Sequence, residues 1–383
     1  MVPRMHVGID CRYIRERPSG IGAYIQALVD RLPHIAPSAR FLFWADRRAS
    51  RPLSHAPNVD ETTVRAGANS PLSTLWPRAY ASVDHLDLFH SPHNILLRGI
   101  KCASVVTVHD VMALDGPWLD RRGIERLSAL YYPQAVRRAL RHATRLIVPT
   151  AATADRVLAW QPDAGRRLRV IPLAPDTCFQ PAADIEAARR RARTLIGCDA
   201  PYVLVVGQNN VNKRHAAAML AFAAAAPPPW RLVLLQRLGR PTRLKRLAVR
   251  LSLADRAVWL RNVPRAEVAA LMQAAAVLMQ PSLYEGFGLP AVEAMASGCP
   301  VIASDIPSLR EVTGGATLLV APDDLSALAQ SLRELLTSPE RRLALAAQGL
   351  TRARAFSWER TARETLAVYE EAAVLGRPAA CAT

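Results

Sequence analysis

The fold is decided by the stretch Tyr284-Glu285-Gly286-Phe287-Gly288-Leu289-Pro290-Ala291-Val292-Glu293. An apolar run over residues 274–281 precedes it and predicts a buried strand. The two glycines allow the backbone to turn sharply and to come close to a ligand. Pro290 suits the first helical position, because the N–H that it lacks would have no partner there. The stretch therefore predicts a strand that turns directly into a helix over residues 291–297.

The start of this helix is a candidate site for an anion. The first N–H groups of a helix are unpaired and the helix dipole is positive there, so a diphosphate would be bound favourably. Two carboxylates, Glu285 and Glu293, flank the turn and would repel a diphosphate unless they point at neutral groups. The neutral groups of a nucleotide diphosphate sugar are the hydroxyls of its sugar and its ribose. The spacing therefore favours a nucleotide-sugar site over a buried turn with incidental glutamates.

Short apolar segments alternate with amphipathic ones along the whole chain, which is typical of open α/β sheets. We expect strands at residues 5–10, 41–44, 86–90, 104–109, 145–149, 202–207, 231–235, 257–260, 274–280, 300–303 and 317–320. The pattern predicts two doubly wound, Rossmann-like domains that face each other across a cleft, with ligand at the carboxyl ends of the strands. The expected divisions are an N-terminal domain (1–175), a nucleotide-sugar-binding domain (176–357), and a terminal helix with a tail (358–383).

Length and composition narrow the class of protein. The 383 residues suffice for two domains that each bury a core. The formal net charge of +17 attracts polyanions or phosphate-bearing ligands, although arginines on solvated faces give the same balance. The sequence lacks zinc-finger spacing and an aromatic RNA-binding motif, which makes nucleic acid the weaker alternative. Six cysteines without CxxC spacing, no signal peptide and no apolar span together predict a reduced, cytoplasmic protein.

The glutamate-x7-glutamate spacing around GFGLP resembles the signature of the retaining glycosyltransferases of family 4, also called group 1. The resemblance covers residues 8–369 and is more specific in the second half. It implies the glycosyltransferase B architecture, in which the last helix, here near 358–375, crosses back to the first domain. It also implies sugar transfer from a nucleotide diphosphate donor to a hydroxyl, with no metal and no other cofactor. By this resemblance Glu285 binds the donor sugar and Glu293 the ribose, and the diphosphate is held by the backbone of Gly286, Phe287, Gly288 and Leu289.

The segment 205–215 resembles the VGxxxxxKN segment of the same family, whose lysine holds the diphosphate. The chain has three lysines among 49 basic residues, so a lysine at position 213 is informative in itself. The Lys213 ammonium would neutralise the charge that develops as the nucleoside diphosphate leaves. Some relatives carry an arginine where this chain has Gln208, and Arg214 stands where asparagine is usual. Arg214 either supplies the missing charge near the donor or faces solvent, and both alternatives remain open.

Two motifs of the first half resemble the first domain of this family. Ser19-Gly20-Ile21-Gly22 resembles its helix start, and Gly22 is expected near the reacting phosphate. Thr107-Val108-His109-Asp110 resembles its TxHD strand end, which implies a neutral His109 that hydrogen-bonds a sugar hydroxyl. His90 and His93 are left open between a ligand contact and an ordinary buried role. The predicted catalytic residues are thus Lys213, Glu285 and His109.

The motifs GIDCR, SGIGAY and TVHD resemble bacterial enzymes of O-antigen and exopolysaccharide assembly, many of which use GDP-mannose. This weakly favours mannose as the sugar and a polyprenyl-diphosphate-linked glycan, at the inner membrane face, as the acceptor. The basic segment from Arg121 to Arg141 either contacts anionic membrane or is solvated charge. Pro133 is expected to kink or break its helix, and Asp323-Asp324 to cap the helix that begins near Leu325.

Two other classes of protein remain as alternatives. A nucleotide-sugar epimerase has the same two-domain layout, and a nucleic-acid-binding protein would account for the net charge. Neither alternative explains the EGFGLPAVE stretch together with Lys213.

Overall fold

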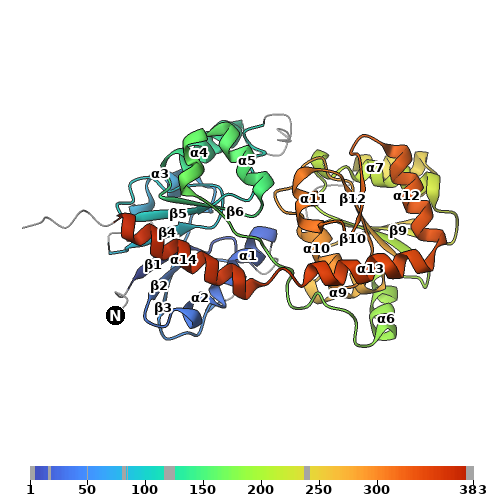
Figure 1. Cartoon of the computed structure of the whole chain (residues 1–383), viewed down its shortest axis with the longest axis horizontal. Coiled ribbons are helices and arrows are strands. Elements are labelled where there is room, and N and C mark those ends of the chain that lie inside the picture. Colours follow the sequence, from blue (N-terminus) through green and yellow to red (C-terminus); the bar gives the residue numbers. More distant parts are fainter. Residues whose placement is uncertain are drawn as a thin grey trace, which may run out of the picture. The chain divides into compact units, whose positions relative to one another are not determined.

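The computed structural model describes residues 5–15, 19–49, 51–79, 83, 85–115, 126–236 and 242–376, with the backbone alone at 78 and 126–130. The described chain divides into two compact units, each built on a parallel sheet with helices packed against it (Figure 1). The first unit holds residues 1–173 and 357–383, and the second holds residues 174–356. The α/β class with two doubly wound, Rossmann-like sheets is therefore confirmed.

The first unit contains a seven-stranded parallel sheet in the order β3-β2-β1-β4-β5-β6-β7. Its strands are β1 (His6–Asp10), β2 (Arg40–Asp46), β3 (Val59–Val64), β4 (Leu88–Ser91), β5 (Ala103–Thr107), β6 (Arg145–Val148) and β7 (Leu168–Val170). Its helices are α1 (Gly20–Val29), α2 (Leu32–Ile35), α3 (Pro71–Leu75), α4 (Arg126–His142), α5 (Ala151–Trp160) and α14 (Trp358–Gly376), with short 3-10 turns at Pro77–Ala79 and Pro162–Arg167.

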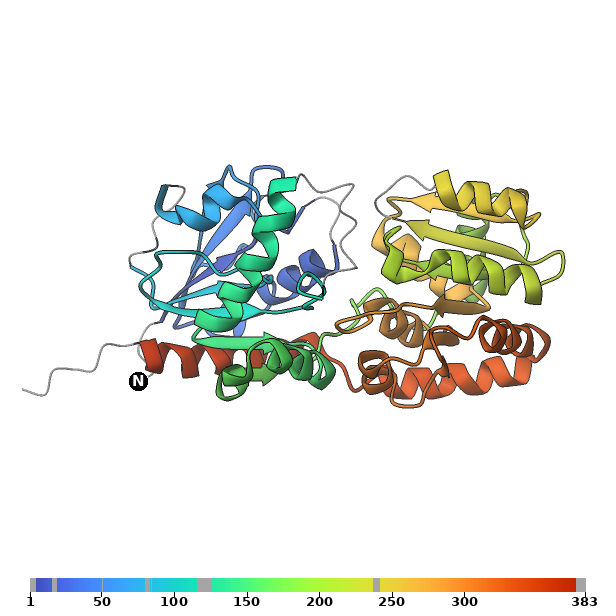
Figure 2. The ribbon, with the colours of Figure 1, turned by 90° about the horizontal axis from the view of Figure 1, so that it is seen from above.

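The second unit contains a six-stranded parallel sheet in the order β10-β9-β8-β11-β12-β13 (Figure 2). Its strands are β8 (Tyr202–Val206), β9 (Arg231–Gln236), β10 (Ala257–Arg261), β11 (Val277–Gln280), β12 (Val301–Ser304) and β13 (Leu318–Val320). Its helices are α6 (Ile185–Ile196), α7 (His215–Ala225), α8 (Thr242–Arg250), α9 (Arg265–Ala274), α10 (Leu289–Ala296), α11 (Pro307–Thr313), α12 (Leu325–Thr337) and α13 (Pro339–Ala353), with a 3-10 turn at Val211–Lys213.

The inner strands β5, β6, β8, β9, β11 and β12 are rich in valine, leucine and isoleucine and are almost fully buried, as parallel sheets with both faces covered require. The strand predictions for this pattern are confirmed, with ends that move by a few residues. Two strands, β3 and β7, were not predicted. Each lies at an edge of its sheet, where one side has no neighbouring strand, and each carries charged residues within a short segment. An apolar pattern is therefore weak in both.

Pro133 does not break its helix, because α4 continues through it from Arg126 to His142. A proline inside a helix removes one hydrogen bond, and the packing of α4 outweighs that loss. The apolar side of α4 contributes Val136, Ala139 and Leu140 to a buried cluster of the first unit. Of the predicted pair Asp323-Asp324, the second residue caps α12, since its side chain accepts a hydrogen bond from the N–H of Ala327 at 2.8 Å.

The last helix, α14, packs on the first unit against α1, α2 and strands β4 to β6. Its Tyr369 hydroxyl is bound to His90 Nδ1 at 2.6 Å, and His90 Nε2 is bound to the Thr107 hydroxyl at 2.8 Å. Glu371 forms ion pairs with Arg145 and Arg169 at the end of the same helix. Residues that lie more than 200 positions apart are thereby joined in one folded unit.

Each sheet reverses its strand order once. In the first unit the reversal lies between β1 and β4, and in the second it lies between β8 and β11. Ligands of open α/β sheets bind outside the carboxyl ends of the strands at such a point. The segments that carry the predicted site residues follow β1, β5, β8 and β11 in the chain.

Candidate functional site

Lys213 and Glu285 form the centre of the candidate site in the second unit. Lys213 follows β8 and Glu285 follows β11, which are neighbouring strands at the reversal of the sheet. The Lys213 ammonium lies 2.7 Å from each of the two carboxylate oxygens of Glu285. The Glu285 side chain is 9% exposed and that of Lys213 is 22% exposed, so the pair is accessible mainly through its lysine.

Two further side chains fix the Glu285 carboxylate. Gln280 Nε2 donates to Oε1 at 2.8 Å, and the Ser282 hydroxyl donates to the same oxygen at 2.7 Å. Gln280 is the last residue of β11, Ser282 follows it by two positions, and both side chains are buried. The carboxylate is therefore held in one orientation, with Oε2 bound to the Lys213 ammonium at 2.7 Å.

The turn between Glu285 and α10 requires glycine at position 288. Gly288 is the N-cap of α10 and has φ of 98°. A Cβ atom there would lie 2.4 Å from Leu309 Cδ2. Only glycine adopts such a backbone without strain and leaves this space clear. Leu289 and Pro290 then begin the helix, whose positive dipole end lies at the turn as predicted.

Glu293 has a partner that the sequence did not indicate. Its Oε1 accepts a hydrogen bond from Arg265 Nη2 at 2.9 Å, and Arg265 Nε also binds Asp176 at 3.1 Å. Burial raises the pKa of the Glu293 carboxyl, although the nearby Arg265 acts against this rise. The Arg265 guanidinium in turn lies over the Phe179 ring at 5.0 Å.

The ion pairs reduce the repulsion that was expected between the two glutamates and a diphosphate. The sequence suggested that both glutamates avoid a diphosphate by facing neutral hydroxyls. In the structure each carboxylate is neutralised by its own cation, Lys213 for Glu285 and Arg265 for Glu293. An anion at the start of α10 is therefore tolerated without requiring that both carboxylates meet hydroxyls.

Arg214 is turned away from the pair. Its backbone is left-handed, with φ of 47°, and it precedes α7. Its guanidinium binds the carbonyl oxygen of Pro322 and lies 3.4 Å from Asp323 Oδ1. His215, the next residue, is buried and is bound by Gln236 at 2.8 Å, and burial lowers its pKa to about 4.

The predicted residues of the first unit lie near Tyr24. Gly22 is in the first turn of α1, and its N–H is capped by the Ser19 hydroxyl at 3.0 Å. The His109 ring packs edge-on against Tyr24, with centroids 5.1 Å apart. His109 Nε2 is bound to the Pro92 carbonyl at 3.1 Å, which requires a proton on Nε2 and leaves Nδ1 as an acceptor. Burial lowers the pKa of His109 to about 4, so the ring is neutral at pH 7.

His90 and His93, whose roles the sequence did not decide, are both buried and hydrogen-bonded to other side chains. Both ring nitrogens of His90 are hydrogen-bonded, to Tyr369 and Thr107, and the side chain is fully buried. His93 Nε2 lies 3.0 Å from Asp10 Oδ2, and the same carboxylate binds Arg12 at 2.6 Å. The pKa of Asp10 is held well below its usual range: burial alone would raise it, and the pairing with Arg12 and His93 more than offsets that. His90 is therefore part of the buried network under α14.

The second unit thus brings together residues that the sequence named with others that it did not. Lys213, Glu285 and the turn 286–289 lie together in the second unit, and Gly22 and His109 lie in the first. Sequence reasoning missed Gln280, Ser282 and Arg265. Arg265 is one arginine among many, and its role depends on a contact with a residue 28 positions away. Gln280 offered a weak signal, because it is a polar residue inside an apolar strand.

Known proteins show the class to which this architecture belongs. The two parallel-sheet units have the glycosyltransferase B fold, as seen in sucrose-phosphate synthase from Thermosynechococcus elongatus. That structure matches with a TM-score of 0.77 and 24% identity, over 96% of this chain and 99% of the other. Among the described residues, no helix is long and apolar enough to cross a membrane.

Residues 187–352 match the family model for "Glycosyl transferases group 1". The MMP alpha-(1->4)-mannosyltransferase of Mycolicibacterium hassiacum is 35% identical over 250 residues, which are 64% of this chain and 58% of that protein. The O-antigen chain mannosyltransferase B of Escherichia coli is 39% identical over 115 residues, which are 29% of this chain and 30% of that protein. The chain thus spans less than two thirds of the length of these relatives in the matched regions.

Proposed function

We propose that this protein is a retaining hexosyltransferase that moves a sugar from a nucleoside diphosphate donor to a hydroxyl of a glycan. The observation that carries this proposal is the Lys213–Glu285 pair beside the glycine turn of α10, at the strand reversal of the second sheet. This place combines an ammonium, a helix start and a fixed carboxylate within one unit. A diphosphate bound there would contact the Lys213 ammonium and the start of α10, and a sugar hydroxyl would contact the Glu285 carboxylate.

Each residue then has a distinct role. Lys213 and the N–H groups of Gly286 to Leu289 bind the diphosphate, and the ammonium stabilises the negative charge that grows on the leaving phosphate. Glu285 accepts hydrogen bonds from sugar hydroxyls through a carboxylate that Gln280 and Ser282 hold in place. Glu293 accepts from the ribose hydroxyls. His109 offers Nδ1 to a sugar hydroxyl, and Gly22 lies near the reacting phosphate.

The reaction exchanges one bond at the anomeric carbon. The bond from that carbon to the phosphate oxygen breaks, the bond to the acceptor oxygen forms on the same face, and the leaving phosphate takes the acceptor proton. This path needs no covalent intermediate with the protein. The chain's own residues bind, orient and neutralise charge.

Mannose is the favoured sugar, with GDP-mannose as donor, because two relatives are described as mannosyltransferases. The acceptor is proposed to be a glycan on a polyprenyl diphosphate, in the assembly of a cell-surface polysaccharide. Peripheral contact with the inner membrane face would follow from such an acceptor. The exposed Arg137 and Arg141 on α4 suit this contact; Arg121 and Arg122, named with them from the sequence, lie outside the described residues.

The test is a thermal-shift panel with UDP-, GDP-, ADP- and CMP-sugars, because a bound donor stabilises the folded state. We expect one nucleotide sugar to raise the melting temperature, and less so in Lys213→Ala. The stabilising sugar is then incubated with a glycan acceptor, and the product's anomeric configuration is read by NMR. Stabilisation by none of the four would contradict the proposal, as would conversion of the free nucleotide sugar to its epimer without an acceptor.

A further inference from the structure

A pocket of about 380 Å³ lies in the first unit between the end of α3 and the outer side of α4. Helices α3 and α4 are neighbours in the first unit (Figures 1 and 2). The lining of this pocket includes the basic side chains of Arg98, Arg137, Arg138, Arg141 and His142, and none of the described residues that line it is an aspartate or glutamate. Positive charge is thus gathered in a hollow rather than spread over a convex surface.

Buried donors of this pocket lack partners. Arg138 Nε is buried and has no hydrogen-bond partner among the described residues. The Tyr131 hydroxyl is buried beside Thr74 and makes no hydrogen bond of acceptable geometry within the described part of the chain. A buried N–H or O–H without an acceptor costs free energy, and native proteins supply an acceptor in nearly every case. The two donors are therefore available to an acceptor from outside the described chain, which is either water or a bound anion.

The charges of the pocket repel each other. Burial lowers the pKa of the Arg138 guanidinium, and the positive charge of Arg98 lowers it further. The pKa of His142 is lowered by partial burial and by the positive charges of Arg138, Arg141 and Arg167. Like charges that face one another without a carboxylate between them are stabilised by a bound anion.

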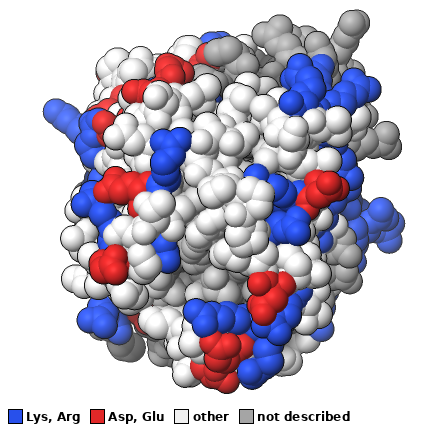
Figure 3. Space-filling view, turned by 90° about the vertical axis from the view of Figure 1, so that its right-hand side faces the viewer, with Lys and Arg blue, Asp and Glu red and all other residues white. Residues whose placement is uncertain are grey.

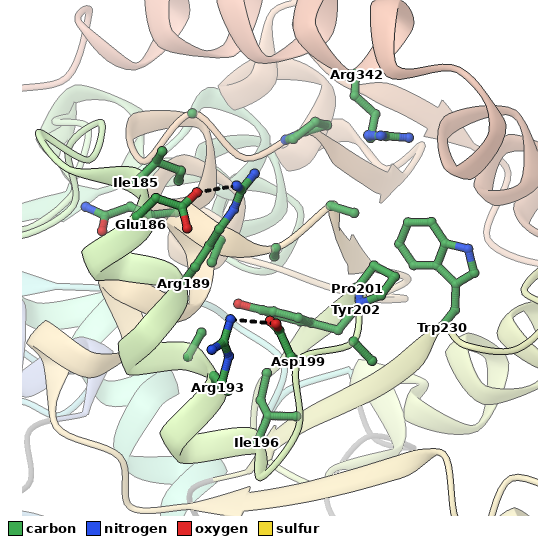
Figure 4. A pocket seen from close by; sticks show the side chains of 18 of the residues that line it. Ile185, Glu186, Arg189, Arg193, Ile196, Asp199, Pro201, Tyr202, Trp230 and Arg342 are labelled. Atoms are coloured by element: carbon green, nitrogen blue, oxygen red, sulfur yellow. Dashed lines mark hydrogen bonds and ion pairs between the residues drawn. The ribbon is translucent and has the colours of Figure 1, made fainter.

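A pocket in the second unit serves as a comparison, because its arginines are paired with acidic side chains or backbone carbonyl oxygens of the protein itself. A hollow of about 620 Å³ in the second unit lies between α6 and α13 (Figure 4). There Arg189 is paired with Glu186 and Arg193 with Asp199, and Arg342 donates to the carbonyl oxygens of Leu335 and Leu336. Interspersed charge of both signs is also visible on the face of the second unit in Figure 3. The α3–α4 pocket differs from both.

We propose that the α3–α4 pocket is a binding site for a phosphate group, held by Arg98 and Arg138 and by the Tyr131 hydroxyl. Guanidinium groups match the geometry of phosphate oxygens and bind them through two parallel hydrogen bonds. The site belongs to the first unit and uses none of the residues assigned to the sugar donor. It is therefore independent of the proposed transfer reaction. The phosphate comes either from a soluble molecule or from a lipid headgroup, and the two sources are distinguished by experiment.

The experiment titrates the intact protein with inorganic pyrophosphate by calorimetry. We expect binding that becomes about tenfold weaker in Arg138→Gln and in Arg98→Gln, as for the loss of a charge-assisted hydrogen bond. Tyr131→Phe should weaken it severalfold and keeps the proposal testable if an arginine variant fails to fold. Arg193→Gln is the matched control, because that arginine lies in the other pocket and is paired with Asp199. Lys213→Ala reports any pyrophosphate bound at the donor site.

Vesicles then identify the source of the phosphate. Binding to phosphatidylcholine vesicles that contain phosphatidic acid, released by pyrophosphate and weakened by Arg138→Gln, assigns a lipid headgroup. Pyrophosphate binding without such vesicle binding assigns a soluble ligand, and the site stands in both cases. The proposal is overturned if the parent protein does not bind pyrophosphate, or if binding is lost only in Lys213→Ala and is unchanged in the Arg98, Arg138 and Tyr131 variants.

Discussion

The Lys213 ammonium lies 2.7 Å from both carboxylate oxygens of Glu285, a residue 72 positions further along the chain. Neighbouring parallel strands bring the two together, because each residue follows the carboxyl end of its strand. The pair is a bidentate, partly buried contact of opposite charges, which holds both side chains near the start of α10.

Lys213→Ala should lower turnover about a hundredfold, because the ammonium meets charge that grows as the donor bond breaks. The measurement is the rate of sugar transfer at saturating donor. Arg214→Ala is the control and should change the rate little, since that guanidinium is bound to Pro322 and Asp323. A fully active Lys213→Ala would assign the charge-stabilising role to Arg214. The transfer rate of the double variant, Lys213→Ala with Arg214→Ala, would then test that assignment.

Glu293→Ala should weaken binding of the nucleoside diphosphate by about 2 kcal/mol and change the chemical step little, because ribose hydroxyls are the same in ground and transition states. Calorimetric titration with the stabilising nucleotide measures the effect. The same change leaves Arg265 without one of its two carboxylates. Comparing Glu293→Ala, Arg265→Ala and the double variant separates the lost ligand contact from the lost ion pair. Equal nucleotide affinity in Glu293→Ala and parent would remove Glu293 from the site.

Gly288→Ala should destabilise the second unit and weaken donor binding, since the added Cβ would lie 2.4 Å from Leu309 Cδ2 at a φ of 98°. Gly197→Ala is a matched control, because its φ of 82° is similar and nothing lies within 4 Å of the added atom. The left-handed backbone destabilises both variants. The difference in melting temperature between them therefore measures the steric clash of the added Cβ with Leu309. Equal melting temperatures would show that Leu309 moves aside at little cost.

Tyr369→Phe should lower the free energy of unfolding of the first unit by about 1–3 kcal/mol, because it leaves the buried His90 Nδ1 without its partner. Urea denaturation followed by fluorescence measures the loss. Tyr13→Phe is the control, since the hydrogen bond of that hydroxyl to Asn69 is exposed. A loss no greater than that of the control would mean that the contacts of α14, rather than this hydrogen bond, hold the helix.

The stability of the fold should fall as the pH falls from about 6.5 towards about 4. Burial lowers the pKa of His109 and of His215 to about 4, and that of His90 to about 3. Between these values and the ordinary value near 6.5, the unfolded chain binds more protons than the folded one, so protons favour unfolding. Melting temperatures recorded across this range should decrease, and His215→Gln should flatten the decrease. A melting temperature that is constant over this range would contradict the buried neutral state of these rings.

Local patterns were enough to predict much of the fold. The apolar runs of the central strands, the glycine turn before α10 and the cap at Asp324 are each encoded within a few residues, and the structure confirms them. The edge strands β3 and β7 were missed because a strand with one neighbour needs little apolar sequence. The break that Pro133 suggested does not occur, because packing, which no local pattern contains, carries α4 through it.

The sequence by itself determined the alternation of strands and helices and the residue types at the turn around Gly288, because backbone preference and hydrophobic periodicity act over short distances. Only the tertiary structure decided which charges meet. Arg265 reaches Glu293, Gln280 and Ser282 hold Glu285, and Arg214 turns to Pro322, although Arg214 stands next to Lys213 in the chain. Strand order sets these contacts, and strand order depends on pairing between distant segments. Coulomb and hydrogen-bond energies then depend on distances in space rather than on positions in the chain.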